Sequence, residues 1–130
     1  MNSESVLDIF REITRIPRES GHEEKMIEFL QKFAAEHNLA CKTDATGNVV
    51  ITKEATPGKE NIPAIALQSH QDMVCEKIAG SKHDFTKDPI NYVVKDGWMI
   101  AEETTLGADD GIGVAATLAL LASDLPTGKV

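Results

Sequence analysis

The segment Ala64–Cys75, with the sequence AIALQSHQDMVC, decides how the rest of the chain is interpreted. It opens with four residues, 64–67, that are small or compatible with β-structure and show no helical period. A short apolar run of this kind predicts a buried strand. The strand would deliver His70 and Asp72 at its carboxyl end, and both would point the same way because side chains alternate along a strand.

His70 and Asp72 together have the chemistry of a metal site. An imidazole binds an ion through one ring nitrogen, and a carboxylate beside it fixes the ring and its tautomer. In α/β folds, ligands gather at the carboxyl ends of strands. A His-x-Asp triplet is short enough to occur by chance, so a simple hydrogen-bonded pair without a ligand is the competing interpretation.

Length and composition restrict the class of protein. A chain of 130 residues is enough for one domain, 1–130, with a hydrophobic core. The net charge of −8 argues against a nucleic-acid-binding surface but is compatible with a metal site. The amino end has no leader pattern and no apolar run approaches about 18 residues, so we expect neither a signal peptide nor a membrane span. Cys41 and Cys75 are expected to be reduced thiols of a cytoplasmic protein.

Two segments near the amino end carry apolar residues at spacings of three and four, which predicts amphipathic helices. The first covers 3–16 and ends at Pro17, because proline disrupts a helix. The second follows Ser20–Glu23, whose residues fit a capping box, and ends near His37.

The remaining patterns predict two hairpins and a third helix. Turns are expected at Asp44–Gly47 and at Asp96-Gly97, each between two runs compatible with β-structure. The segment Gly111–Leu121 is rich in alanine, valine, isoleucine and leucine, which predicts a buried helix. Helices and strands are interspersed, so the fold class is α/β.

Asp109 and Asp110 precede this last helix and allow two interpretations. Aspartate is common at helix starts, where it complements the helix dipole. The small neighbours Gly107 and Gly111 would also let the backbone approach an ion closely. A carboxylate there could reach a metal held by His70 and bridge it to a second ion, as in co-catalytic pairs that lie about 3.5–4 Å apart.

Two motifs carry a resemblance to a known family. SHQDMV at 69–74 and TTLGADDGIGVA at 104–115 resemble, in this order, the two amino-terminal motifs of the co-catalytic zinc peptidases. That family includes carboxypeptidases, aminoacylases, tripeptidases and dipeptidases. The motifs are most similar to those of the aminoacyl-histidine (Xaa-His) dipeptidase subgroup. The resemblance extends to SVLDIFREITRIPRESGHEEKMIEFL at 5–30 and so covers essentially the whole chain.

The resemblance implies a role for each site residue. His70 would ligate one of two zinc ions, for which Co²⁺ or Mn²⁺ could substitute. Asp72 would act in catalysis by orienting the His70 ring, and Asp109 would bridge the two ions. A cis peptide bond is implied between Asp109 and Asp110, and no definite role is assigned to Asp110. The implied fold is the amino-terminal part of a zinc-peptidase catalytic domain, with a mixed sheet and flanking helices.

The resemblance also implies an activity. The intact enzyme would be a cytoplasmic, homodimeric metallodipeptidase that hydrolyses Xaa-His dipeptides, such as β-alanyl-histidine, with a metal-activated water. In the family a Glu-Glu pair follows the bridging aspartate and includes the general base, and no such pair lies between Asp110 and Val130. We therefore expect 1–130 to be an amino-terminal portion that is inactive alone. The alternatives are a related aminoacylase or tripeptidase, and a non-catalytic binding or structural domain.

Overall fold

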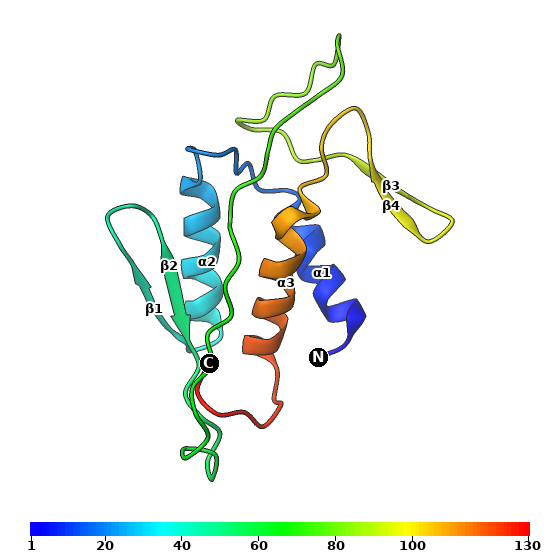
Figure 1. The fold of residues 1–130 in the computed structure, drawn as a ribbon. Helices are drawn as coiled ribbons and strands as arrows, with labels where there is room; N and C mark the ends of the chain where they lie inside the picture. The colour runs from blue at the N-terminus through cyan, green and yellow to red at the C-terminus, as the bar shows by residue number, and fades with distance from the viewer.

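The computed structural model describes residues 1–130 and confirms the α/β class. Figure 1 shows α1 beside α3, with α2 and the first hairpin on the other side of the molecule. None of the three helices combines the length and the apolar composition that a membrane-spanning helix needs. In chain order the elements are α1 (Ser3–Ile13), α2 (Glu24–Glu36), β1 (Ala40–Thr43), β2 (Val49–Thr52), β3 (Tyr92–Lys95), β4 (Trp98–Ala101) and α3 (Ala108–Ala122).

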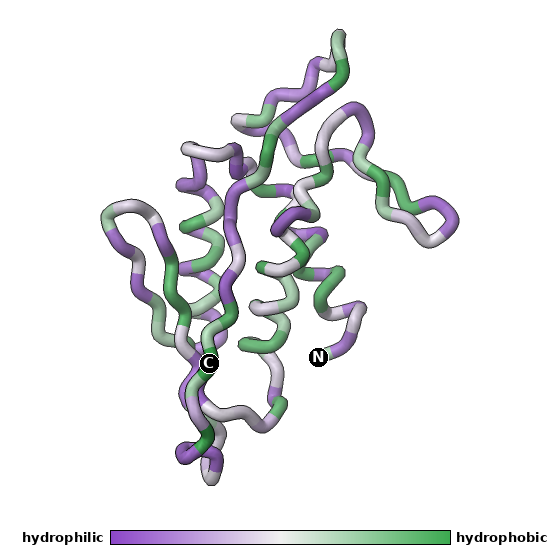
Figure 2. The backbone as a smooth tube through the Cα atoms, in the orientation of Figure 1, coloured by the Kyte–Doolittle hydropathy of each residue, from purple (hydrophilic) through white to green (hydrophobic).

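The core forms where the apolar faces of the three helices meet. Figure 2 shows hydrophobic residues alternating with polar residues along α1 and α2. Burial of these side chains holds the start of α3 against α1 and so fixes the backbone around Asp109. The buried cluster consists of Phe10 and Ile13 from α1, Met26, Leu30 and Phe33 from α2, and Val114, Ala115, Leu118 and Leu121 from α3.

The start of α3 is irregular. Asp109 and Asp110 have non-helical backbone angles, and the peptide bond between them is cis, as the resemblance implied. Regular helix begins at Gly111, in agreement with the sequence pattern, and Ser123 follows its last residue. The irregular turn leaves the Asp109 side chain 96% exposed beside His70.

Both predicted hairpins are confirmed. β1 pairs antiparallel with β2, and β3 pairs antiparallel with β4. The side chain of Asp44 stabilises the first turn by accepting hydrogen bonds from the backbone N–H groups of Thr46 and Asn48. Each hairpin forms its own two-stranded sheet, so the described chain does not contain the expected mixed sheet.

The prediction of a strand over 64–67 is wrong. The segment is extended, but Ile65 and Leu67 are 55% and 45% exposed, and no ladder forms there. The backbone contact of this run with a neighbouring segment is the N–H of Ile65 donating to the carbonyl of Lys129. A strand needs a hydrogen-bonded partner along its length, and no segment within 1–130 supplies one.

Two helix boundaries also differ from the prediction. α1 ends at Ile13, and the backbone then tightens into bonds between residues three apart, such as Ile16 N–H to the Ile13 carbonyl. The capping box at Ser20–Glu23 does not form, because α2 starts after Glu23 without a side-chain cap. The Ser20 hydroxyl instead contacts the candidate site.

Replacing Gly111 by alanine is expected to lower the free energy of unfolding. An added Cβ would lie 2.6 Å from Nη2 of Arg18 and 2.9 Å from Cε2 of Phe10, both side chains being buried. Overpacking costs about 1–3 kcal/mol, which offsets or exceeds the roughly 1 kcal/mol that alanine gains over glycine within a helix. Urea unfolding measures the difference.

Gly113→Ala is the matched control for this substitution. The Cβ at Gly113 would lie closer still to Oδ1 of Asp110, which is the end of a half-buried side chain without a hydrogen bond. Rotation of that carboxyl group relieves this contact more easily than two buried side chains relieve the contact at Gly111. We expect Gly113→Ala to leave stability unchanged or raise it. Equal effects at the two positions would show that the packing around Gly111 is not tight.

Candidate metal site

The structure brings His70, Asp72 and Asp109 together. Nδ1 of His70 lies 3.0 Å from Oδ1 of Asp72, and Nε2 of the same ring lies 3.0 Å from Oδ1 of Asp109. The expectation that His70 and Asp72 point the same way is therefore confirmed. The two carboxylates hold opposite nitrogens of one imidazole, although 39 residues separate His70 from Asp109.

Ser20 extends this arrangement and was missed by the sequence analysis. Its hydroxyl donates to Oδ2 of Asp72 over 2.5 Å. This hydrogen bond is the main reason why the pKa of Asp72 is lowered. Burial acts in the opposite direction, and the contacts of Asp72 with the backbone and with His70 lower the pKa further. Asp72 is thus kept ionised and in place, as a carboxylate that orients a histidine ring requires.

Asp110 does not join the other three residues. Its carboxyl group folds back over the first regular turn of α3 beside Gly113. No side-chain capping bond forms at this helix start, where Gly107 occupies the cap position with a left-handed φ of 76°. Asp109, and not Asp110, therefore faces His70.

The pKa of His70 is raised mainly by its hydrogen bond with Asp109. Burial opposes this shift, and the contacts with Asp72 add to it. In the metal-free protein, the protonated ring therefore stabilises the folded state. The whole of this contribution is present at pH values below the ordinary histidine pKa of about 6.5. This contribution is lost as the pH rises through the raised pKa. It is small, since the His70 side chain is 52% exposed.

We expect an NMR titration of His70 in chelator-treated protein to give a midpoint above about 6.5. Asp109→Asn should move that midpoint down, because a neutral amide stabilises the imidazolium less than a carboxylate does. A midpoint at or below the ordinary value, unmoved by the substitution, would contradict the observed pairing.

The residues at this site fit part of a zinc-binding set. Zinc takes imidazole nitrogen and carboxylate oxygen at about 2.0–2.2 Å, so two ligands of a tetrahedral ion lie about 3.3 Å apart. The 3.0 Å between Nε2 of His70 and Oδ1 of Asp109 is close to that separation. The exposed Asp109 carboxylate also has a second oxygen available for another ion. No group of three or more histidine, cysteine or acidic side chains within 1–130 is arranged to hold one metal ion, so the chain supplies only part of a four-coordinate site.

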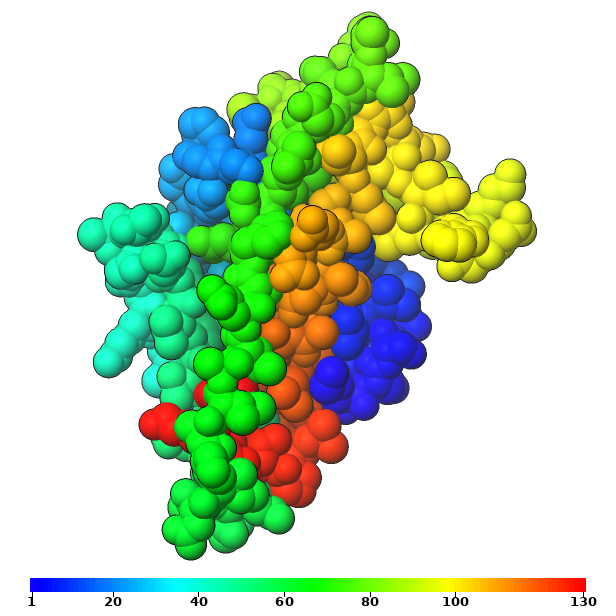
Figure 3. All heavy atoms as spheres, viewed as in Figure 1, coloured from blue at the N-terminus to red at the C-terminus, as the bar shows by residue number.

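A groove of about 850 Å³ includes His70 and Asp72 in its lining. Its other walls come from α2, β2, the extended residues 64–69 and the apolar face of α3. Figure 3 shows the extended segment on the molecular surface, between the first hairpin and α3. The candidate ligands are therefore accessible from solvent next to a partly apolar hollow.

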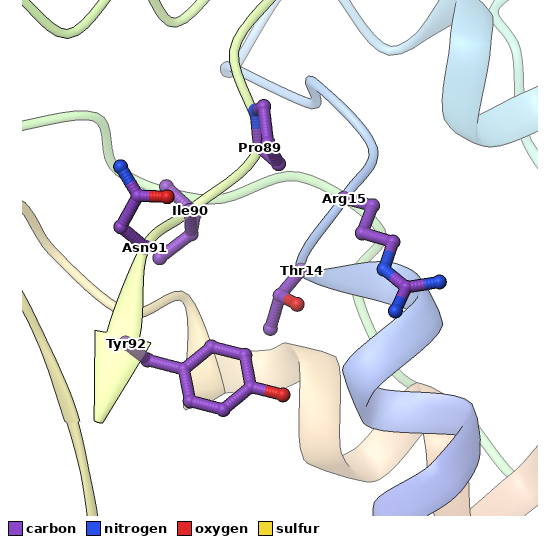
Figure 4. A pocket seen from close by; sticks show the side chains of 6 residues that line it. All are labelled: Thr14, Arg15, Pro89, Ile90, Asn91 and Tyr92. Carbon is purple, nitrogen blue, oxygen red and sulfur yellow. The ribbon is translucent and has the colours of Figure 1, made fainter.

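A second hollow of about 400 Å³ lies between the end of α1 and the start of β3. Figure 4 shows its lining, in which Arg15 is the one charged side chain. It contains no imidazole, thiol or carboxylate and therefore lacks metal ligands. The lining residues are Thr14, Arg15, Pro89, Ile90, Asn91 and Tyr92.

Comparison with known proteins supports the resemblance to peptidases, although no protein-family model matches the chain. The chain is 44% identical over 124 residues to the cytosol non-specific dipeptidase of Escherichia coli K12, an alignment that covers 95% of this chain and 26% of that protein. It is similar to the crystal structure of aminoacylhistidine dipeptidase from Vibrio alginolyticus, with a TM-score of 0.93 and 42% identity over 99% of this chain and 26% of that one.

A solved structure with lower sequence identity to this chain is also a peptidase. A tripeptidase from Staphylococcus aureus matches with a TM-score of 0.80 and 27% identity, over 99% of this chain and 35% of that one. The chain thus spans about a quarter of the length of the dipeptidases it matches. Its resemblance to dipeptidases, predicted from the two motifs, is confirmed over nearly all of its residues.

Proposed function

We propose that this homologue of the dipeptidases supplies His70, Asp72 and Asp109 to the metal site of a metal-dependent dipeptidase. One observation carries the proposal: a single imidazole is held between two carboxylates from distant segments, one anchored by Ser20 and the other almost fully exposed. The metal proposed is zinc, two ions per site, with Co²⁺ or Mn²⁺ as substitutes. The chemistry of the donors, nitrogen plus carboxylate oxygen, supports this choice.

Each residue has a distinct task in this proposal. Asp72 accepts a hydrogen bond from Nδ1 of His70, which leaves Nε2 as the ligating nitrogen on the side of Asp109. Asp109 would hold metal together with His70, and its exposed carboxylate has two oxygens with which to do so. Bound metal ions supply Lewis acidity and lower the pKa of a bound water, which makes it a nucleophile for a peptide carbonyl.

The rest of the catalytic machinery is proposed to lie outside residues 1–130. Relatives of this chain are about four times as long, which leaves room for a general-base glutamate, further metal ligands and a dimerisation domain. We propose a homodimer for the same enzyme, on resemblance alone. The name of the Escherichia coli relative, a cytosol dipeptidase, supports a cytoplasmic location.

The substrate class is a small dipeptide, and carboxyl-terminal histidine is the preferred second residue. The relative solved from Vibrio alginolyticus is described as an aminoacylhistidine dipeptidase and is 42% identical to this chain, which supports this preference. The Escherichia coli relative is 44% identical and is described as non-specific, which supports some breadth among dipeptides. The tripeptidase is 27% identical, which favours the dipeptidase over the tripeptidase activity. Aminoacylase activity has no support among these relatives.

The proposal is tested on the protein as its gene encodes it. We expect elemental analysis to find two zinc ions per chain, and chelation to abolish hydrolysis until zinc is restored. A panel of β-alanyl-histidine, other dipeptides, a tripeptide and an N-acetyl amino acid should show hydrolysis of the dipeptides foremost. Preferred cleavage of the tripeptide or the N-acetyl amino acid would identify the related activity instead. Absence of both metal and hydrolysis would leave the non-catalytic interpretation.

A further inference from the structure

We propose that Arg18 is a positioning residue that holds the segment carrying His70 and Asp72 against the loop carrying Asp109. The proposal rests on the proposed metal site and adds a residue that contacts neither metal nor substrate. Arg18 is 1% exposed, so its guanidinium group lies inside the protein.

The guanidinium group of Arg18 bonds to both segments at once. Nη1 donates to the backbone carbonyls of Gln71 and Asp72, at 3.2 and 3.0 Å. Nη2 donates to the carbonyl of Gly107 at 2.5 Å, two residues before Asp109. One planar group therefore fixes the separation between the two halves of the candidate site.

The backbone of Arg18 adds a further contact with the histidine segment. The N–H of Met73 donates to the carbonyl of Arg18 over 2.9 Å. The neighbouring Glu19 forms a parallel bridge with Met73. Arg18 is therefore attached to this segment through both its main chain and its side chain.

Two glycines make room for the guanidinium group. A Cβ atom added at Gly107 or at Gly111 would lie 2.6 Å from Nη2 of Arg18. At Gly107 it would also lie 2.8 Å from Sδ of Met73. The two glycines of the TTLGADDG motif that flank the Asp109–Asp110 pair therefore leave the space that the Arg18 guanidinium group occupies.

The cost of burying Arg18 argues that it does more than stabilise the fold. The guanidinium group forms no ion pair, and its Nε is buried without a partner. Burying a charge outside an ion pair is expensive. Burial lowers the pKa of Arg18, and the negative charges of Asp72 and Asp110 oppose this effect only in part. Donating to three carbonyls of two segments from one rigid, planar group is a task for which the arginine side chain is suited.

Lysine cannot take over this task. Its single ammonium nitrogen is a point donor, whereas the two Nη atoms of arginine reach separate carbonyls. We therefore expect both Arg18→Lys and Arg18→Met to weaken zinc binding by about 10- to 100-fold, the range found when residues that orient metal ligands are changed. The kcat for dipeptide hydrolysis should fall, and KM should change much less, because the substrate does not contact Arg18.

The experiment compares Arg18→Lys, Arg18→Met and Phe33→Ala in the protein as its gene encodes it. Phe33 is 8% exposed in the later part of α2, and its removal costs stability without touching the guanidinium bonds. Zinc affinity is measured by competition with a chromogenic chelator, at a temperature where each variant is fully folded. Hydrogen exchange of 69–73 and 105–111 is measured separately in metal-free protein.

The two Arg18 variants should lose zinc affinity and exchange faster in both segments, whereas Phe33→Ala should keep the zinc affinity of the unchanged protein. Unchanged affinity and unchanged exchange in the folded Arg18 variants would overturn the positioning role. Equal losses in Phe33→Ala would also overturn it, since they would show an effect of stability alone. If the unchanged protein binds no zinc, the proposed function fails, while faster exchange of both segments in the variants would still establish the attachment by Arg18.

Discussion

Replacing His70 by alanine in the protein as its gene encodes it should abolish the proposed dipeptide hydrolysis while leaving the fold intact. The substitution removes the one imidazole of the site and leaves Asp72 and Asp109 without a group between them. We expect kcat to fall by about 10³-fold, the upper end of the loss found when one group that stabilises transition-state charge is removed, because the metal ion that supplies this stabilisation would lose its histidine ligand. The His70 side chain is 52% exposed, so the free energy of unfolding should change by no more than about 0.5 kcal/mol.

Metal content and stability together decide how this result is interpreted. Elemental analysis should find one zinc ion lost, and thermal unfolding of the metal-free variant should match that of the unchanged protein. His22→Ala is the matched control, because His22 is an exposed histidine outside the site. If His70→Ala unfolds the protein and leaves the metal content of the remaining folded molecules unchanged, His70 has a structural role and the non-catalytic interpretation gains support.

Elements that depend on neighbouring residues could be predicted from the sequence. The turn at Asp96-Gly97 and the turn at Asp44–Gly47 both form where the pattern placed them. The side-chain bonds of Asp44 explain why, since donor and acceptor lie within four residues of each other. The side-by-side placement of His70 and Asp72 follows from the same kind of local rule, the alternation of side chains in an extended chain.

Features that depend on distant residues could not be predicted in the same way. Ser20 fits the local pattern of a capping box, yet its hydroxyl bonds to Asp72, which is 52 residues away. The run 64–67 has the composition of a strand, but strand formation requires a partner that the local pattern does not specify. Arg18 reads as an ordinary charged residue after Pro17, although it is among the most buried residues of the chain.

Asp109 illustrates where resemblance adds to local reasoning. From the residues alone, the Asp109–Asp110 pair allowed both a helix cap and a metal ligand. The motif assigned the ligand role to Asp109, and the structure places its carboxylate against Nε2 of His70. The helix-cap alternative has no support, because no side-chain capping bond forms at the start of α3.

Replacing Asp109 by asparagine is the second substitution with a large expected effect. Asparagine has nearly the same shape, but it is neutral and offers one oxygen where the carboxylate offers two. We expect kcat to fall by about 10²- to 10³-fold, as when one group that stabilises the transition-state charge is removed. Because the Asp109 side chain is 96% exposed, urea unfolding of the metal-free variant should match that of the unchanged protein.

The pattern of metal loss distinguishes a bridging ligand from a ligand of one ion. If Asp109 contacts both ions, Asp109→Asn weakens both, whereas His70→Ala weakens only the ion bound to its ring. Zinc titrations should therefore show two weakened sites in the first variant and one in the second. Asp124→Asn is the control, since it removes an exposed carboxylate just after α3. If Asp109→Asn still binds two zinc ions with unchanged affinity, Asp109 does not bridge the ions. Its contact with His70 would then be only a hydrogen bond.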